Sequence, residues 1–260
     1  MISHLHIFLL AALCGSLLAG SAAAQQDRET AMQVSTIDSL LSGNYDGEMS
    51  LEEMLTHGDF GIGTFDRLDG EMLVLGGVVY QIAADGVARV MPPETTTPFA
   101  TVTFFEADQR VDLKPGMTLP AWKEATDKLL PTPNLFYAIK IEGMFRTMKT
   151  RSVPRQSKPY GNLRQIADSQ PTFDFEDVEG TLVGFRCPGY VGGINVPGYH
   201  LHFLTEDKRA GGHVLEFTVE HAEMTIDHTP NFLLKLPGSK EFYATDLEKD
   251  QSEDLRAVEQ

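Results

Sequence analysis

Short runs of apolar residues, broken by turn-forming pairs, fill much of this chain and favour β-strands. Between residues 61 and 105 the breaks are Asp-Gly, Gly-Gly and Pro-Pro pairs, which turn the backbone or end a strand. A further strand is expected over residues 135–141. The pattern predicts a sheet of hairpins, with strands over residues 72–75, 78–82, 87–90 and 100–105.

Helical patterns are fewer and mostly short. An apolar stripe predicts a helix over residues 35–41, and a capping box that begins at Ser50 predicts a second helix directly after it. A longer amphipathic helix is expected over residues 120–130, and a short one over residues 162–167. In the longer helix, the side chains expected to face the core are Trp122, Ala125 and Leu129.

The chain has 260 residues, of which 42% are hydrophobic, so it is long enough for one large domain or two small ones. A polar, irregular segment after residue 157 separates the first β-rich half from the second. We therefore expect an α/β (α+β) fold with two β-rich mixed-sheet domains, over residues 25–157 and 158–260, and a few peripheral helices.

The first 25 residues contain no Lys, Arg, Asp or Glu, and they carry a long apolar run that ends in Ala22-Ala23-Ala24. This pattern predicts a signal peptide over residues 1–24 and an exported mature protein, periplasmic or secreted. Cys14 would be removed with the signal peptide, which leaves Cys187 as a lone cysteine that we expect to be structural. No later stretch is long enough to span a membrane.

Acidic residues outnumber basic ones, 37 to 21, and give a formal net charge of −16 at pH 7. Such a chain repels phosphate backbones and anionic lipids, so neither nucleic acid nor a membrane is an expected partner. A small anionic substrate would still need a local group of cations. Residues 149–158 provide one, because they include four basic residues and no acidic one: Lys149, Arg151, Arg155 and Lys158.

Three histidines within 14 residues form the strongest candidate site. His200 and His202 lie two apart in a strand-like run, so both imidazoles point to the same face. A hairpin centred on Asp207-Lys208 places His213 opposite His202, where cross-strand Cβ atoms are about 4.5–5.5 Å apart. Three neutral imidazoles suit Zn²⁺ and leave a coordination position open for substrate. The sequence thus predicts a catalytic zinc site on a β-hairpin of the second half.

The residues alone also suggest roles for the apolar positions after His213, for Arg151 and for Glu71. Strand periodicity predicts that Leu215, Phe217 and Val219 share the face of His213. Arg151 could hold a carboxylate with its guanidinium group or belong to a solvated loop. Glu71 begins a predicted strand, where its carboxyl group could act as an acid or base or be simply exposed.

Several separate blocks together span most of the chain: HGDFGIGTF (57–65), LDGE (68–71), KTRSVPRQ (149–156), NVPGYHLHF (195–203) and GGHVL (211–215). These blocks resemble the α-acetolactate decarboxylase family, and the resemblance runs from about Ser35 to the C-terminus. It implies a two-domain α/β protein, forming a homodimer, that converts 2-acetolactate (2-hydroxy-2-methyl-3-oxobutanoate) to acetoin and carbon dioxide. The implied reaction passes through a metal-stabilised enediolate and needs no organic cofactor.

The resemblance also implies roles for individual residues. The implied zinc ligands are His200, His202 and His213. Glu71 and Arg151 are implied to contact the substrate and handle protons, and a glutamate near the C-terminus is implied to close over the site. We assign this last role to Glu259, with Glu253 as the alternative.

Two other functions fit parts of the same pattern. His200 and His202, followed by Glu206, match the ligand spacing of a cupin-like dioxygenase or isomerase, which would bind iron or manganese. In a cupin, however, the last histidine would come from a distant motif, whereas His213 follows His202 by 11 residues. The second alternative is a non-catalytic, exported zinc-binding module.

Overall fold

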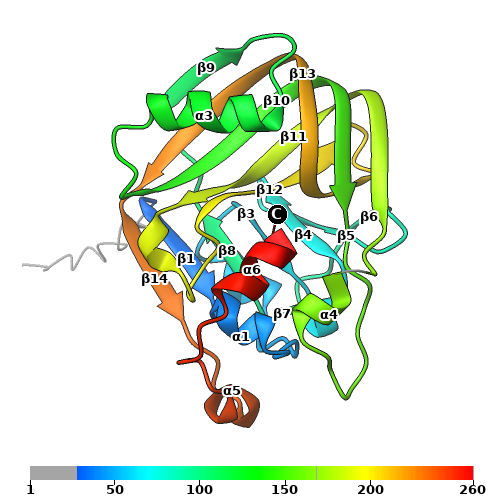
Figure 1. Ribbon diagram of the computed structural model, residues 1–260, viewed down its shortest axis with the longest axis vertical. Helices are drawn as coiled ribbons and strands as arrows, with labels where there is room; N and C mark the ends of the chain where they lie inside the picture. Colours follow the sequence, from blue (N-terminus) through cyan, green and yellow to red (C-terminus); the bar gives the residue numbers. More distant parts are fainter. Residues whose placement is uncertain (1–27, 168, 260) are drawn as a thin grey trace, which may run out of the picture.

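The computed structural model describes residues 28–167 and 169–259, and its strands form two large sheets with short helices around them (Figure 1). The predicted mixed class of strands and helices is confirmed. The predicted signal peptide, residues 1–24, and Cys14 lie outside the described residues. In the part of the chain that the structure describes, no helix has the length and apolarity needed to cross a membrane.

The first sheet has seven strands in the order β14-β1-β8-β3-β4-β5-β6. One side of it is the predicted set of hairpins, since β4, β5 and β6 pair in chain order with antiparallel register and β6 forms the edge. Strand β14 comes from the second half of the chain and pairs in parallel with β1. The strands are β1 (Thr30–Val34), β3 (Phe60–Thr64), β4 (Glu71–Leu75), β5 (Val78–Ile82), β6 (Ala88–Val90), β8 (Ala100–Thr103) and β14 (Asn231–Lys235).

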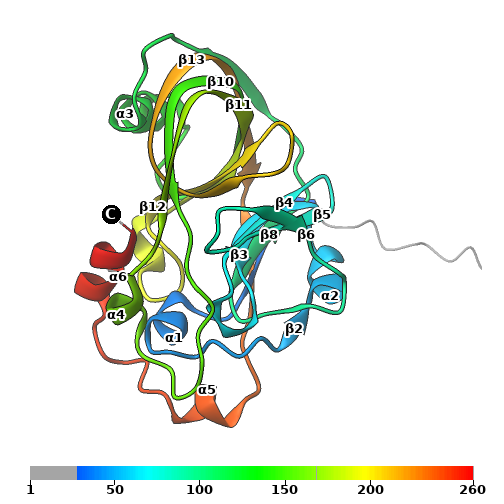
Figure 2. The ribbon, with the colours of Figure 1, turned by 90° about the vertical axis from the view of Figure 1, so that its right-hand side faces the viewer.

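The second sheet closes on itself, because β10 pairs with both β11 and β13, and β12 lies between those two strands (Figure 2). Strand β10 is much longer than the expected 135–141 strand and reaches Arg151, with register shifts that let it curve against β13. The strands are β9 (Gln109–Leu113), β10 (Phe136–Arg151), β11 (Thr172–Cys187), β12 (Gly198–Thr205) and β13 (Gly211–Thr229).

The expected boundary between two domains, after residue 157, stays a prediction. The strands of the two sheets are not separated at that boundary. Strands β9 and β10 precede residue 157 but belong to the second sheet, whereas β14 follows residue 158 and belongs to the first. Buried side chains of both sheets share one apolar cluster, in which Ile62 and Leu73 pack with Val183 and Leu204. This packing brings β4 of the first sheet against β12 of the second.

Helix α2 begins at the predicted cap Ser50, and α1 also begins directly after a capping residue. Thr36 accepts a hydrogen bond from the Ser39 N–H, and Ser50 accepts one from the Glu53 N–H. The α-helices are α1 (Ile37–Leu41), α2 (Leu51–Leu55), α3 (Leu119–Leu129), α4 (Leu163–Ala167), α5 (Lys240–Ala244) and α6 (Ser252–Glu259). The short remaining elements are the strands β2 (Met49–Ser50) and β7 (Thr96–Thr97) and the 3-10 helices η1 (Asp66–Leu68) and η2 (Gly189–Val191).

One face of α3 differs from the prediction. Trp122 is fully buried as expected, but the expected core residue Leu129 is 45% exposed. Thr126 and Leu130 are buried instead, because spacing of four residues keeps them on the Trp122 side of the helix. Cys187, at the end of β11, is buried, and burial raises the pKa of its thiol to about 12, as fits a structural residue.

Candidate metal centre and active site

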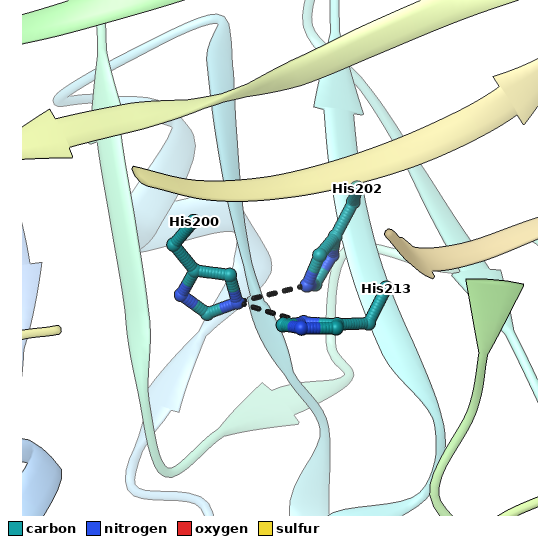
Figure 3. Close-up of side chains that lie close together, drawn as sticks. All are labelled: His200, His202 and His213. Atoms are coloured by element: carbon teal, nitrogen blue, oxygen red, sulfur yellow. Dashed lines mark hydrogen bonds between the residues drawn. The ribbon is translucent and has the colours of Figure 1, made fainter. Parts of the chain in front are cut away.

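Three imidazoles converge where β12 and β13 pair (Figure 3). Alternation along β12 puts His200 and His202 on one face, and His213 pairs directly with His202, so the predicted hairpin register is confirmed. His200 Nε2 lies 3.1 Å from His213 Nδ1 and 3.2 Å from His202 Nε2. Tetrahedral bonds of about 2.0–2.1 Å would separate ligand nitrogens by roughly 3.3 Å. The spacing therefore fits one small metal ion, and these three residues form a group that could hold it.

The environment prepares all three imidazoles as neutral ligands. Burial and the nearby Arg151 charge lower the pKa of His200 to about 3, and burial holds the pKa values of His202 and His213 well below the usual range. His202 Nδ1 lies 2.7 Å from the Met72 carbonyl oxygen. Since only a protonated Nδ1 can donate to that carbonyl, Nε2 keeps its lone pair and faces the other imidazoles. Strand β4 thus orients a ligand carried by β12.

A β-bulge next to His213 changes which residues share its face. In the pairing with β10, Val214 lies opposite Thr150 and Glu216 lies opposite Lys149, so Leu215 is the extra residue. The apolar cluster of the second sheet contains Val214, with Phe217 and Val219, but not Leu215. The expectation that Leu215, Phe217 and Val219 continue the histidine face is therefore wrong, because the bulge reverses the alternation.

Two carboxyl groups reach the histidines from opposite parts of the chain. Glu71, the first residue of β4, has Oε2 3.4 Å from His202 Nε2. Glu259, at the end of α6, has Oε2 3.8 Å from His200 Nε2 and 4.0 Å from His213 Nε2. Burial raises the pKa of Glu71 to about 8 and that of Glu259 to about 7, and the Arg151 charge opposes both shifts. Both groups can therefore hold a proton near neutral pH.

Arg151 is the last residue of β10 and lies directly opposite His213. It therefore lies beside the candidate metal site and not in a solvated loop. Its guanidinium group donates a hydrogen bond to the Val258 carbonyl oxygen at the end of α6. Its positive charge acts on both nearby carboxyl groups and on all three imidazoles. Arg151 is thus the cation of this site.

The other basic residues of the 149–158 segment are directed elsewhere. Arg155 forms an exposed ion pair with Asp69, and Lys158 forms one with Asp46. Lys149 lies opposite Glu216 in the register of β10 and β13. The cation cluster predicted from composition therefore contributes one residue, Arg151, to the site.

Helix α6, which lies in front of the strands in Figure 1, covers one side of the site with Val258 and Glu259. Leu255 and Val258 pack into an apolar cluster with residues of α1 and α4. Gln251, just before the helix, donates to the Asp38 carbonyl oxygen and so attaches the helix to α1. This arrangement turns Glu259 inward, whereas the alternative residue Glu253 is exposed on the first turn.

A cavity of about 50 Å³ adjoins the histidines. It has room for only a few water molecules. Its polar wall includes Glu71, Arg151 and Glu259, and its other wall is apolar. The apolar side chains are Ile37, Leu40, Leu68, Phe99, Val153, Leu163 and Val258. An apolar wall facing one guanidinium group, two carboxyl groups and the imidazoles of His200 and His213 is the arrangement expected of a small-molecule site.

The model of the alpha-acetolactate decarboxylase family matches residues 31–249. The chain belongs to this family. An alpha-acetolactate decarboxylase from Methanosarcina mazei is 54% identical over 227 residues, which are 87% of this chain and 79% of that protein. One from Bacillus subtilis is 41% identical over 228 residues, which are 87% of this chain and 89% of that protein. Decarboxylases of this kind are carbon–carbon lyases, so the chain is a member of an enzyme family.

The fold agrees with the family. The crystal structure of alpha-acetolactate decarboxylase from Bacillus subtilis superposes with a TM-score of 0.87 and 40% identity, covering 88% of this chain and 99% of that one. The matched residues of the family model end at 249, before α6 begins. The place of Glu259 in the site therefore rests on its distance from His200.

Two parts of the site carried no sequence signal. The Met72 carbonyl that orients His202 and the Val258 carbonyl that receives Arg151 are main-chain groups. Any residue type has such a group, so only the tertiary structure identifies them.

Proposed function

We propose that this protein is a zinc-dependent acetolactate decarboxylase, which converts 2-acetolactate to acetoin and carbon dioxide. The observation that carries the proposal is the convergence of three neutral imidazoles, Arg151 and two protonatable carboxyl groups at one small cavity. Membership of the alpha-acetolactate decarboxylase family supports the same reaction.

His200, His202 and His213 would hold the zinc ion, since their donor set, spacing and neutral state fit a tetrahedral site with an open position. Bound zinc supplies Lewis acidity, which stabilises negative charge on the substrate oxygens. The 2.7 Å contact of His202 with the Met72 carbonyl keeps this ligand in the tautomer whose Nε2 can bind the metal.

The remaining groups fit the needs of the substrate. The Arg151 guanidinium faces the cavity, where it can hold the anionic substrate by charge-assisted hydrogen bonds. Loss of carbon dioxide leaves an enediolate, which must accept one proton at carbon to become acetoin. Glu71 and Glu259 approach from different elements, and each can carry that proton, so together they control which face receives it.

The experiment is turnover of racemic 2-acetolactate by the purified mature protein, followed by acetoin and carbon dioxide release. We expect activity that a strong chelator abolishes and that zinc restores. Iron or manganese restoring activity in place of zinc would contradict the assigned metal. No turnover by a folded, zinc-loaded sample would contradict the reaction and would favour the non-catalytic zinc-binding module.

The cupin-like alternative has no support from the hairpin. Glu206, its required carboxylate ligand, is exposed in the turn between β12 and β13, where its N–H donates to the Glu179 carbonyl. Among the described residues, the metal-ligand group contains the three histidines and no carboxylate.

Export and dimer formation complete the proposal. Export through the predicted signal peptide would give a mature chain that begins at Gln25, which N-terminal sequencing of the exported protein checks. A first residue of Met1 would contradict it. Light scattering checks the homodimer, and a mass equal to one mature chain would contradict that part.

A further inference from the structure

A second cavity, of about 820 Å³, lies next to the histidine site. Its walls are the segment 192–199, which leads into β12, the C-terminal segment 247–259, Thr36 and Asp38 at the start of α1, and Lys123 of α3. Figures 1 and 2 show α3 and α6 on the same side of the molecule, with β12 between them. Glu259 lines this cavity and also the small cavity at the histidines, so the two spaces adjoin at that residue.

Lys123 of α3 lines the larger cavity beside Tyr199, the residue before His200. Its side chain is partly buried, and burial lowers the pKa of its ammonium group. Its charge makes a small contribution to the lowered pKa of His213, after burial and the charge of Arg151. Lys123 therefore lines the larger cavity, and its positive charge also contributes to the electrostatic potential at the histidines.

The acidic residues of α3 are already engaged with other partners. Glu124 forms an ion pair with Lys128, and Asp127 accepts a hydrogen bond from the Tyr199 hydroxyl and lies near Arg186. Within the described ranges, Lys123 has no hydrogen-bond or ion-pair partner. A partly desolvated ammonium group without a counter-ion is destabilising, and an arriving carboxylate would relieve that cost.

We infer that the 820 Å³ cavity is the entry route for the substrate, and that Lys123 attracts and positions the substrate carboxylate before it passes Glu259. The inference rests on the proposed function. The chain has a net charge of −16, and the lining itself is mixed in charge, with Asp38, Glu248, Asp250 and Glu259 beside Lys123, Lys249 and Arg256. An anion that enters therefore needs a local cation to offset the repulsion. Lys123 acts here on binding and approach, while Arg151 acts at the histidines.

The charge part of the inference is tested by Lys123→Met, with Lys128→Met as the matched control. Both variants remove one positive charge from α3, but Lys128 is exposed and paired with Glu124. We expect Lys123→Met to lower kcat/KM for 2-acetolactate by about 5- to 10-fold at low ionic strength, and less at high ionic strength, with kcat and zinc content unchanged. Lys123→Arg should restore most of the loss, and Lys128→Met should resemble the wild type.

Inhibition by acetoin shows whether Lys123 acts through its charge or through the shape of the cavity. Acetoin is neutral, so its inhibition constant should be the same in Lys123→Met and the wild type. Equal effects of the Lys123 and Lys128 substitutions, or an equal loss for substrate and acetoin, would overturn the role of Lys123. A fall in kcat with unchanged KM would overturn it as well, because that result belongs to the chemical step.

The route itself is tested by Gly192→Phe, with Gly189→Phe as the control. Gly192 lines the cavity and Gly189 does not, and a Cβ atom at either position meets open space. We expect Gly192→Phe to weaken both substrate capture and acetoin inhibition and Gly189→Phe to change neither. Identical behaviour of the two variants would overturn the route. Absence of turnover in the wild type would overturn the proposed function together with this inference, whereas wild-type turnover with indistinguishable variants would overturn this inference alone.

Discussion

Glu259 Oε2 lies 3.8 Å from His200 Nε2, so the last turn of α6 places a carboxyl group at the three histidines. We predict that Glu259→Gln lowers kcat by about 10²-fold or more, because the amide cannot carry the proton. Glu253→Gln, on the exposed first turn of the same helix, should leave kcat unchanged. Steady-state kinetics with acetoin detection measures both. A loss at Glu253 and none at Glu259 would reverse the assignment.

Arg151 is predicted to be the one basic residue of the 149–158 segment that the reaction needs. Arg151→Ala should lower kcat/KM by about 10²-fold or more, since the cavity loses its cation and α6 loses the hydrogen bond at Val258. Arg155→Ala, which breaks only an exposed ion pair with Asp69, is the control and should have little effect. Full turnover and full stereoselectivity of Arg151→Ala with zinc still bound would show the assignment to be wrong.

Metal content gives a prediction that does not depend on turnover. His202→Ala should remove most of the bound zinc, because it deletes the ligand that the Met72 carbonyl orients. His221→Ala replaces an exposed histidine on β13 that lies outside the ligand group, and it should retain the metal. Elemental analysis after dialysis, with circular dichroism to check folding, measures the difference. Equal zinc content in the two folded variants would contradict the histidine site.

The buried Asp227 lies away from the active site, and we predict that it makes the stability of the protein depend on pH. Its side chain is 1% exposed, and burial, with the nearby acids Asp108, Glu29 and Glu106, raises its pKa to about 7. The folded state therefore keeps the proton between the unfolded pKa and about pH 7, so the free energy of unfolding falls as the pH rises through that window. The loss should amount to about 2–4 kcal/mol.

Asp227→Asn removes this titration while keeping an acceptor for the Glu106 N–H. We expect the variant to match the wild type near about pH 4 and to be more stable by about 2–4 kcal/mol above about pH 8. Asp112→Asn, on the neighbouring strand β9, removes an exposed carboxyl group and should follow the wild type. Urea unfolding at a series of pH values checks this, and parallel curves for all three proteins would contradict it.

The local elements were predictable where periodicity and turn residues agree. The hairpins of the first sheet, the pairing of His202 with His213 and the burial of Trp122 follow from spacing of two or four residues along the chain. Prediction failed where packing overrides that spacing. The bulge at Leu215 and the exposure of Leu129 depend on neighbouring strands and on where the core ends, which a local pattern does not record.

The candidate site divides in the same way. The sequence by itself determined the three histidines, because a two-residue period and a short hairpin bring them together without help from the rest of the chain. The family resemblance already implied Glu71, Arg151 and Glu259, but only the tertiary structure shows how they reach the histidines, since these residues come from β4, β10 and α6. The contacts of Arg151 and Glu259 also agree with the choice of Arg151 among four basic residues and of Glu259 over Glu253. Long-range packing sets these contacts, and the same burial that creates the site raises the carboxyl pKa values and lowers those of the imidazoles.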